Sequence, residues 1–255
     1  MTDLTIIHHQ NLGEEYMQIY DDFFRGFPGY HVVRSLKENG HDGSSIIPHP
    51  LPSEFALSFF NEKKNGIFVD VGANDGIAWS NSLIFEKLFS WTGLCIEANP
   101  YLYKELEACR SCLCVNCAVD EDETEKIFWN IVGDCSGLSG LEKGFCHVPA
   151  IGLLNNHMEH IEQEMTRTES VRKKMSMVTR RLAPILAEHD ISHIDYLSID
   201  VEGNELGVLK GVDFDACSCT LISVESNGRT STQNYLAKFG YNLLTTICRD
   251  DFYAR

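Results

Sequence analysis

From Gly66 onward, short apolar runs alternate with segments whose apolar residues recur at helical spacing, and this rhythm constrains the fold more than any other feature. Each run is short and uninterrupted, as is typical of a strand buried on both faces of a parallel sheet. Repeated β-α-β units of this length predict a sheet with helices on both faces. The predicted strands are Ile67–Val71, Gly93–Glu97, Cys112–Val119, Met175–Val178, Ile194–Ile199, Thr220–Glu225 and a last one after Gly240-Tyr241; the predicted helices are Asn81–Ser90, Tyr101–Cys109, Leu182–His189, Glu205–Lys210 and Gln233–Phe239.

Two segments do not follow this rhythm. Residues 1–65 are rich in proline and histidine, with short helices predicted at Glu14–Phe24 and from Ser53, a candidate N-cap, to Asn61. We interpret them as an N-terminal extension of an α/β domain that spans 66–255. Residues 133–172 follow an extra, more exposed strand at Glu125–Val132 and combine a Gly/Ser-rich stretch with a polar helix around Asn155–Thr168. Such a long insertion between sheet elements predicts a lid or substrate-binding segment.

The composition limits the partners of this chain. It has 37 acidic and 21 basic residues, a formal net charge of −16. Because such a charge repels phosphate backbones, nucleic acid is not an expected partner. No apolar run approaches the roughly 20 residues that cross a bilayer, so no membrane span is expected. The start of the chain lacks a basic, apolar secretory signal, so we expect a cytoplasmic protein whose ten cysteines stay reduced.

The strongest local motif is Val69-Asp70-Val71-Gly72-Ala73-Asn74-Asp75-Gly76, which closes the first predicted strand. Glycines at a strand-to-helix turn let a ligand approach the backbone closely. The spacing is not the GxGxxG of a nicotinamide-binding turn, and acids at the strand end and in the loop suit a cationic, aminoacyl-like ligand better than a pyrophosphate. Glu97 ends the next strand, where its two carboxylate oxygens could hold a ribose diol. Together these features indicate an adenosine-bearing cofactor.

A second set of acids ends the later strands. The run Ile194–Ile199 delivers Asp200 and Glu202 to its carboxyl end, and the next strand ends at Glu225. Open α/β sheets bind ligands at this edge, so we expect Asp70, Asp200 and Glu225 to converge there. Glu202 also has a simpler interpretation, as a solvated acid near a helix N-terminus.

These motifs resemble the FkbM-like methyltransferases, which depend on S-adenosylmethionine. The resemblance covers roughly 66–255 and is carried by Val69–Gly76, Trp91–Pro100, and Ile194–Glu205 with Val208–Gly211; Ser136–Gly140, Glu225 and Gly240-Tyr241 also match. The chain departs from the family pattern at Ala183, where an acid is common. The resemblance implies a Rossmann-like methyltransferase fold with a mostly parallel seven-stranded sheet, an N-terminal extension and an inserted lid.

The resemblance also implies roles for individual residues. Asp70, Gly72, Ala73, Asn74, Asp75 and Gly76 would wrap the methionine and ribose of the cofactor, Glu97 would bind the ribose hydroxyls, and the turn from Ala118 to Asp120 would lie along the adenine. Ser80, Asn81 and Ser82 would bind the methionine carboxylate, with helix capping as the alternative.

The function that follows is O-methylation of a small molecule or glycan, with a sugar favoured by family analogy alone. A hydroxyl is a weak nucleophile at neutral pH, so a base should assist; Asp200 is the first candidate, with Glu202 and Glu225 as alternatives, and Asp200 also borders the cofactor site. Three oxygen ligands also suit Mg²⁺, and the sequence does not decide whether a metal binds. A non-catalytic binding module and a nucleotide-dependent oxidoreductase remain alternatives. The sequence leaves the oligomeric state open.

Overall fold

In the computed structural model, residues 52–61, 63–146, 157–226, 230–247 and 249–255 are described. The chain divides into two compact units, Met1–Pro48 and His49–Arg255. The described residues all belong to the second unit, so the predicted helix Glu14–Phe24 and most of the predicted extension lie outside them. No described helix has the length and apolar character to span a membrane.

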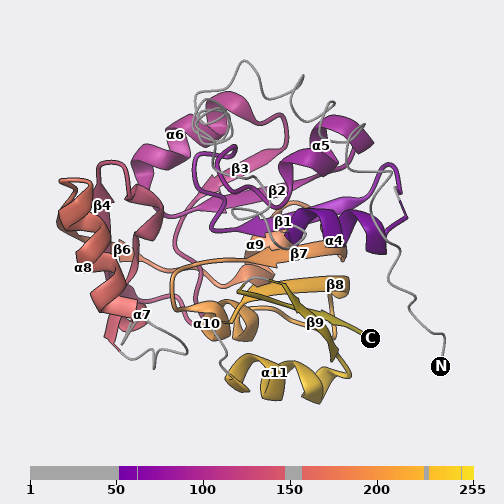
Figure 1. Cartoon of the computed structure of the whole chain (residues 1–255). Coiled ribbons are helices and arrows are strands. Elements are labelled where there is room, and N and C mark those ends of the chain that lie inside the picture. The colour runs from indigo at the N-terminus through magenta and orange to yellow at the C-terminus, as the bar shows by residue number, and fades with distance from the viewer. Residues whose placement is uncertain (1–51, 62, 147–156, 227–229, 248) are drawn as a thin grey trace. The chain divides into compact units, whose positions relative to one another are not determined.

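A seven-stranded sheet forms the centre of this unit (Figure 1), with strand order β3-β2-β1-β7-β8-β10-β9. Its strands are β1 (Ile67–Val71), β2 (Thr92–Glu97), β3 (Leu113–Asn116), β7 (His193–Ile199), β8 (Ser218–Glu225), β9 (Asn242–Ile247) and β10 (Asp250–Ala254). The pairs from β3 through β8 are parallel, whereas β10 is antiparallel to both β8 and β9. The predicted α/β fold with a mostly parallel sheet is confirmed.

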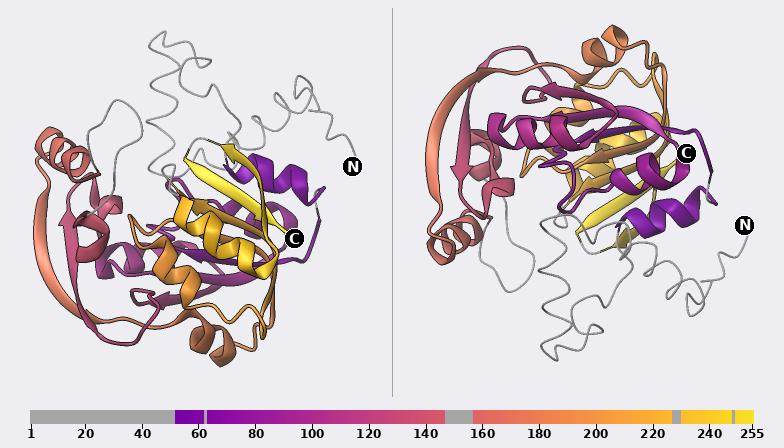
Figure 2. Two further views of the ribbon diagram at one scale, coloured as in Figure 1. Left: turned by 90° about the horizontal axis from the view of Figure 1, so that it is seen from below. Right: turned by 90° about the horizontal axis from the view of Figure 1, so that it is seen from above.

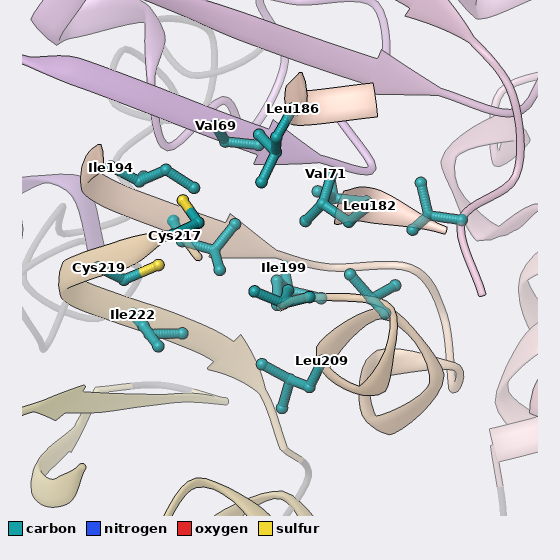
Figure 3. Close-up of a cluster of buried hydrophobic side chains, with 14 of the residues drawn as sticks. Val69, Val71, Leu182, Leu186, Ile194, Ile199, Leu209, Cys217, Cys219 and Ile222 are labelled. Carbon is teal, nitrogen blue, oxygen red and sulfur yellow. The ribbon is translucent and has the colours of Figure 1, made fainter. Parts of the chain in front are cut away.

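Helices cover both faces of this sheet (Figure 2). Three helices lie on one face: α9 (Leu182–Glu188), α10 (Glu205–Lys210) and α11 (Thr230–Leu236), which continues into η2 (Ala237–Phe239). Their leucines Leu182, Leu186, Leu209 and Leu236 are buried in the main core. Figure 3 shows Leu182 and Leu186 of α9 beside Val69 and Val71 of β1. Since valines and isoleucines of the central strands fill this layer, the apolar runs of the sequence account for it.

The opposite face is packed with aromatic rings. It is covered by α4 (Pro52–Phe59), α5 (Leu83–Phe89) and α6 (Pro100–Cys109). The Phe85 ring of α5 lies 4.6 Å from that of Trp91 and 5.6 Å from that of Tyr196 on β7. The Phe55 ring of α4 lies 4.6 Å from that of Phe252 on β10. Helix α4 therefore belongs to the packing of the α/β unit; it begins at Pro52 rather than after a Ser53 cap, because proline suits the first helical turn.

A separate three-stranded sheet is inserted between β3 and α9. It has the order β5-β4-β6, from β4 (Glu125–Val132), β5 (Gly140–Leu141) and β6 (Val171–Val178), all antiparallel. The turn η1 (Ser136–Leu138) and the helices α7 (Glu142–Cys146) and α8 (His157–Arg167) complete the insertion. The extra strand predicted at Glu125–Val132 and the polar helix around 155–168 are confirmed.

Three details of the predicted strands are wrong. The segment Met175–Val178 belongs to β6, which pairs with β4 instead of joining the main sheet. The last strand is a hairpin of two strands, β9 and β10, so the main sheet still has seven strands. The third strand ends at Asn116 rather than Val119, since Arg180 bonds the backbone on both sides of Val119 and so ties that stretch to the chain entering α9.

The aromatic layer predicts an uneven cost of substitution along α5. We expect Phe85→Ala to lower the free energy of unfolding by about 3–5 kcal/mol, because Phe85 is fully buried between two rings. Leu88→Ala on the same helix, where 36% of the side chain is exposed, should cost about 1 kcal/mol or less. Urea denaturation measures both, and equal losses would contradict the layer described.

Candidate functional site at the carboxyl ends of the parallel strands

The strand order reverses between β1 and β7, because β2 and β3 extend the sheet on one side and β8 on the other. Open α/β sheets bind ligands outside the carboxyl ends of the strands at such a point. The Val69–Gly76 motif and Asp200 both lie there, since Asp200 N donates to Val71 O at 3.0 Å. The topology therefore brings the two sequence motifs together.

Gly72 begins the loop after β1 and touches the end of β7. Its φ is +89°, and a Cβ placed on it would lie 1.7 Å from the backbone oxygen of Asp200. The amides of Gly72 and Ala73 both donate to Ile96 O on β2, at 2.9 and 3.0 Å. Only glycine fits this conformation and this contact, which explains the glycine at this turn.

Glu97 ends β2 and links two loops. Its side chain is buried; Oε2 accepts from Asn74 N at 2.9 Å and Oε1 from Asn99 N at 2.7 Å. Burial raises the pKa of Glu97 to about 7 despite these hydrogen bonds. A carboxyl group at this position has acceptor capacity beyond the two backbone bonds and changes charge near neutral pH.

The rest of the loop is held by its own side chains. Asp75 Oδ1 accepts from the amides of Ile77 and Ala78 at 2.8 and 2.7 Å, so this acid closes a turn. Asn74, with φ +54°, donates from Nδ2 to Ala78 O at 3.4 Å. These bonds within the loop fix its turn.

Asp70 points away from the loop into a buried polar network. Ser82 Oγ donates to Asp70 Oδ2 at 2.5 Å, and Arg110 Nη2 donates to Ser82 Oγ at 3.0 Å. Burial raises the pKa of Asp70, while Ser82 and the Arg110 charge oppose that rise. Arg110 also donates to Gly76 O at 3.2 Å and is paired with Glu86 at 2.6 Å. Asp70 and Ser82 thus bind Arg110, directly or through one hydrogen bond, and Arg110 in turn binds the loop at Gly76 O.

The other predicted helix-start residues have structural partners too. Ser80 Oγ accepts from Leu83 N, the first residue of α5, at 3.1 Å, whereas the N-cap Ser82 makes no side-chain capping bond. Asn81 Nδ2 donates to Ser198 Oγ on β7 at 3.1 Å. These bonds fix the start of α5 against the loop.

Ala118 and Asp120 follow β3 and face the inserted sheet. Ala118 is buried in a cluster with Phe128 and Leu141. Asp120 is fully buried and ion-paired with Lys126 and with Lys143, the latter at 2.6 Å. These two lysines lower the pKa of Asp120. The charge of Asp120 is therefore neutralised by two lysines of the insertion.

Acids gather at the ends of β7 and β8. Burial and the carboxylates of Glu225, Glu202 and Asp250 raise the pKa of Asp200 well above its usual range. Glu225 is buried; its Oε1 accepts from Arg249 at 3.3 Å, and its Oε2 has no hydrogen-bond partner among the described residues. Of the three acids predicted to converge, Asp200 and Glu225 interact, with Glu202 beside them. The prediction is wrong for Asp70, whose carboxylate accepts from Ser82 in the buried network instead.

Sequence reasoning missed three residues here. Asp250 lies directly opposite Glu225 in the β10–β8 register, and burial with Glu225 raises its pKa to about 7. The other two are Arg249, which is paired with Glu225, and Arg110, which is paired with Glu86. The signal for Asp250 was the second half of the C-terminal hairpin, which the sequence interpretation treated as one strand.

The acids do not form a metal centre in the part of the chain that the structure describes. No three or more His, Cys, Asp or Glu side chains there are arranged to hold an ion. Burial and mutual repulsion instead raise the pKa values of Asp200 and Asp250.

Comparison with known proteins relates most of the chain to one family. The model described as the methyltransferase FkbM domain matches residues 70–248. Among solved structures, the chain is similar to methyltransferase FkbM from Methylobacillus flagellatus KT, with a TM-score of 0.45 and 15% sequence identity. That alignment covers 75% of this chain and 44% of the other, so this chain spans less than half of that protein's length. No curated protein matches the chain.

The Gly72 contact predicts a difference between two glycines of similar φ. Gly240, at +83°, has no atom within 4 Å of a Cβ placed on it, so Gly240→Ala should cost about 1–2 kcal/mol of backbone strain. Gly72→Ala should cost about 3 kcal/mol or more, because the clash with Asp200 adds about 1–3 kcal/mol to similar strain. Urea denaturation measures the free energy of unfolding of both variants. Similar losses would mean that Gly72 does not touch the backbone of Asp200.

Proposed function

Because the chain belongs to the FkbM methyltransferase domain family, we propose that it transfers the methyl group of S-adenosylmethionine to a hydroxyl oxygen of a small molecule or glycan, with a sugar favoured. This proposal depends most on the position of Glu97. Its buried carboxyl group accepts a hydrogen bond from Asn74 N in the Gly72–Gly76 loop, which lies where the strand order of the sheet reverses. The sugar preference rests on the family alone.

The residues at this edge fit an adenosine-bearing cofactor. Glu97 offers two carboxylate oxygens to a ribose diol, and its bonds to Asn74 and Asn99 hold it in place. The absence of a side chain at Gly72 lets the loop lie directly against the end of β7. The turn of Asp75 then presents backbone toward the methionine part.

S-adenosylmethionine supplies an activated methyl group on a sulfonium cation. Asp200 and Glu225 lie at the ends of β7 and β8, and Asp250 of β10 faces Glu225, so the ionised forms of these acids would stabilise a nearby cation. The same crowding raises the pKa values of Asp200 and Asp250, so these groups keep protons more readily than free acids do. A neighbouring cation would favour their charged forms.

Asp200 is the proposed general base. S-adenosylmethionine, when bound, would supply a methyl group with a thioether as the leaving group, and the Asp200 carboxylate would take the proton that the acceptor hydroxyl loses. A base works best when its pKa lies near the working pH, and the neighbours of Asp200 shift it upward in that direction. Glu225 and Glu202 act in this scheme by setting the charge around Asp200. The predicted lid, residues 133–172, is proposed to cover the acceptor.

The ribose role of Glu97 predicts a pH-dependent affinity for S-adenosylhomocysteine. With a pKa of about 7, Glu97 is largely protonated at pH 6, whereas two donor hydroxyls favour the carboxylate. Affinity should therefore rise between pH 6 and 8 and level off above that range. Glu97→Gln should lower the affinity at pH 8 by about tenfold or more and flatten this rise, as titration calorimetry can measure.

The matched control is Glu107→Gln, an exposed acid on α6, which should leave both affinity and slope unchanged. If folded wild-type protein does not bind S-adenosylhomocysteine, the methyltransferase proposal fails and the binding-module alternative replaces it.

The base role of Asp200 predicts a loss in transfer. Asp200→Asn should lower the rate of methyl transfer by roughly 10²- to 10⁴-fold at saturating cofactor, because the acceptor proton loses its base. The assay follows labelled methyl from S-adenosylmethionine into sugar and glycan acceptors. Asp215→Asn, an exposed acid after α10, is the control and should transfer normally. Normal transfer by Asp200→Asn would remove Asp200 from the mechanism.

A further inference from the structure

Asn130 of β4 is a buried polar side chain that has no hydrogen-bond partner among the described residues. Only 1% of it is exposed, and neither its Oδ1 nor its Nδ2 bonds to any described residue. Burying an unpaired amide is costly, and such groups are rare in folded proteins. A side chain that the protein does not satisfy is a candidate for satisfaction by a ligand.

The sheet register shows which way Asn130 faces. Asn130 shares a face of β4 with Phe128, which packs against Ala98 and Ala118 beyond the ends of β2 and β3. The other face carries Trp129, whose ring lies 4.6 Å from the Arg172 guanidinium, and Ile131, which packs against Ile161 of α8. Asn130 therefore faces the carboxyl ends of the main sheet.

Two hydrogen-bonded side chains connect this strand to Glu97. Ile131, the next residue along β4, donates its amide to Ser139 Oγ at 2.9 Å, and Asn99 Nδ2 donates to the same oxygen at 3.2 Å. Asn99 in turn gives its amide to Glu97. The free amide thus lies on a strand fixed to the proposed ribose acid.

The residues on this side of β4 favour a flat heterocycle with a polar edge. Phe128 shares the face of Asn130 and packs with Ala98 and Ala118, and such apolar groups suit the face of a ring. Asp120, the acid predicted beside the adenine, is ion-paired with Lys126 and Lys143. The amide of Asn130 is the unpaired donor and acceptor on this side, among the residues described.

We propose that Asn130 recognises the adenine of S-adenosylmethionine. Its Oδ1 accepts from the exocyclic amino group and its Nδ2 donates to the adjacent ring nitrogen, the pairing that asparagine makes with adenine in other settings. This inference rests on the proposed function and adds a specificity residue supplied by the inserted sheet rather than by the main sheet.

The test compares S-adenosylhomocysteine with its analogue that lacks the 6-amino group, by titration calorimetry. Wild-type protein should bind the analogue about tenfold more weakly, as expected for a lost hydrogen bond to a buried group. Asn130→Leu should bind S-adenosylhomocysteine at least about tenfold more weakly and distinguish the two ligands less than about twofold. Asn242→Leu, the same change on β9 at the far edge of the main sheet, should behave as wild type.

Unfolding without ligand provides the second readout. Because the amide is unpaired in the protein, Asn130→Leu should unfold at the same urea concentration as wild type or a higher one. A lower midpoint would show that the amide has a partner within the protein and would overturn the inference.

The remaining outcomes separate the two proposals. If wild-type protein binds both ligands equally, or if Asn130→Leu keeps full affinity and discrimination, Asn130 does not recognise adenine, whereas the methyltransferase proposal stands. The wild-type comparison holds even if the variant fails to fold. If wild-type protein binds neither ligand, both proposals fail.

Discussion

The carboxyl group of Glu97 joins the two loops on which the candidate site depends. Through Asn74 it holds the glycine loop after β1, and through Asn99 it holds the start of α6. Asn99 then caps that helix by accepting from Tyr101 N at 3.0 Å and also reaches Ser139 in the insertion. A buried acid with a pKa of about 7 is costly to ionise, so the surrounding backbone amides must partly replace water. Each loop thus has one backbone amide bound to this group.

A second set of buried polar groups, centred on Arg110, also holds the glycine loop. Arg110 is buried yet donates to Gly76, Ser80 and Ser82, and it is paired with Glu86. Its charge also compensates the buried Asp70. The motif acid of the first strand therefore stabilises the loop indirectly, while the backbone of the loop remains at the edge of the sheet.

The inserted sheet is bound to the edge of the main sheet where the candidate site lies. Its lysines neutralise Asp120, its Ser139 bonds Asn99, and Gly144 of α7 lies so close to Gly203 that a Cβ on Gly144 would be 2.4 Å from Glu202 O. These contacts join the insertion to the ends of β2, β3 and β7. A segment first interpreted as a lid is thus part of the wall against which we place the adenine.

Local sequence patterns were enough to predict most of the elements and the acids at the strand ends. Helix Glu205–Lys210, the apolar strands, the glycine turn and the placement of Glu97, Asp200 and Glu225 follow from periodicity and from residues within a few positions of one another. The tertiary structure alone decided which elements became neighbours: β6 paired with β4, Asp250 lay opposite Glu225, and Arg110 reached Ser82. It also decided that Asp120 is neutralised and that the Asn130 amide is left unpaired. Burial and pairing depend on partners that are distant along the chain, and a local pattern carries no information about them.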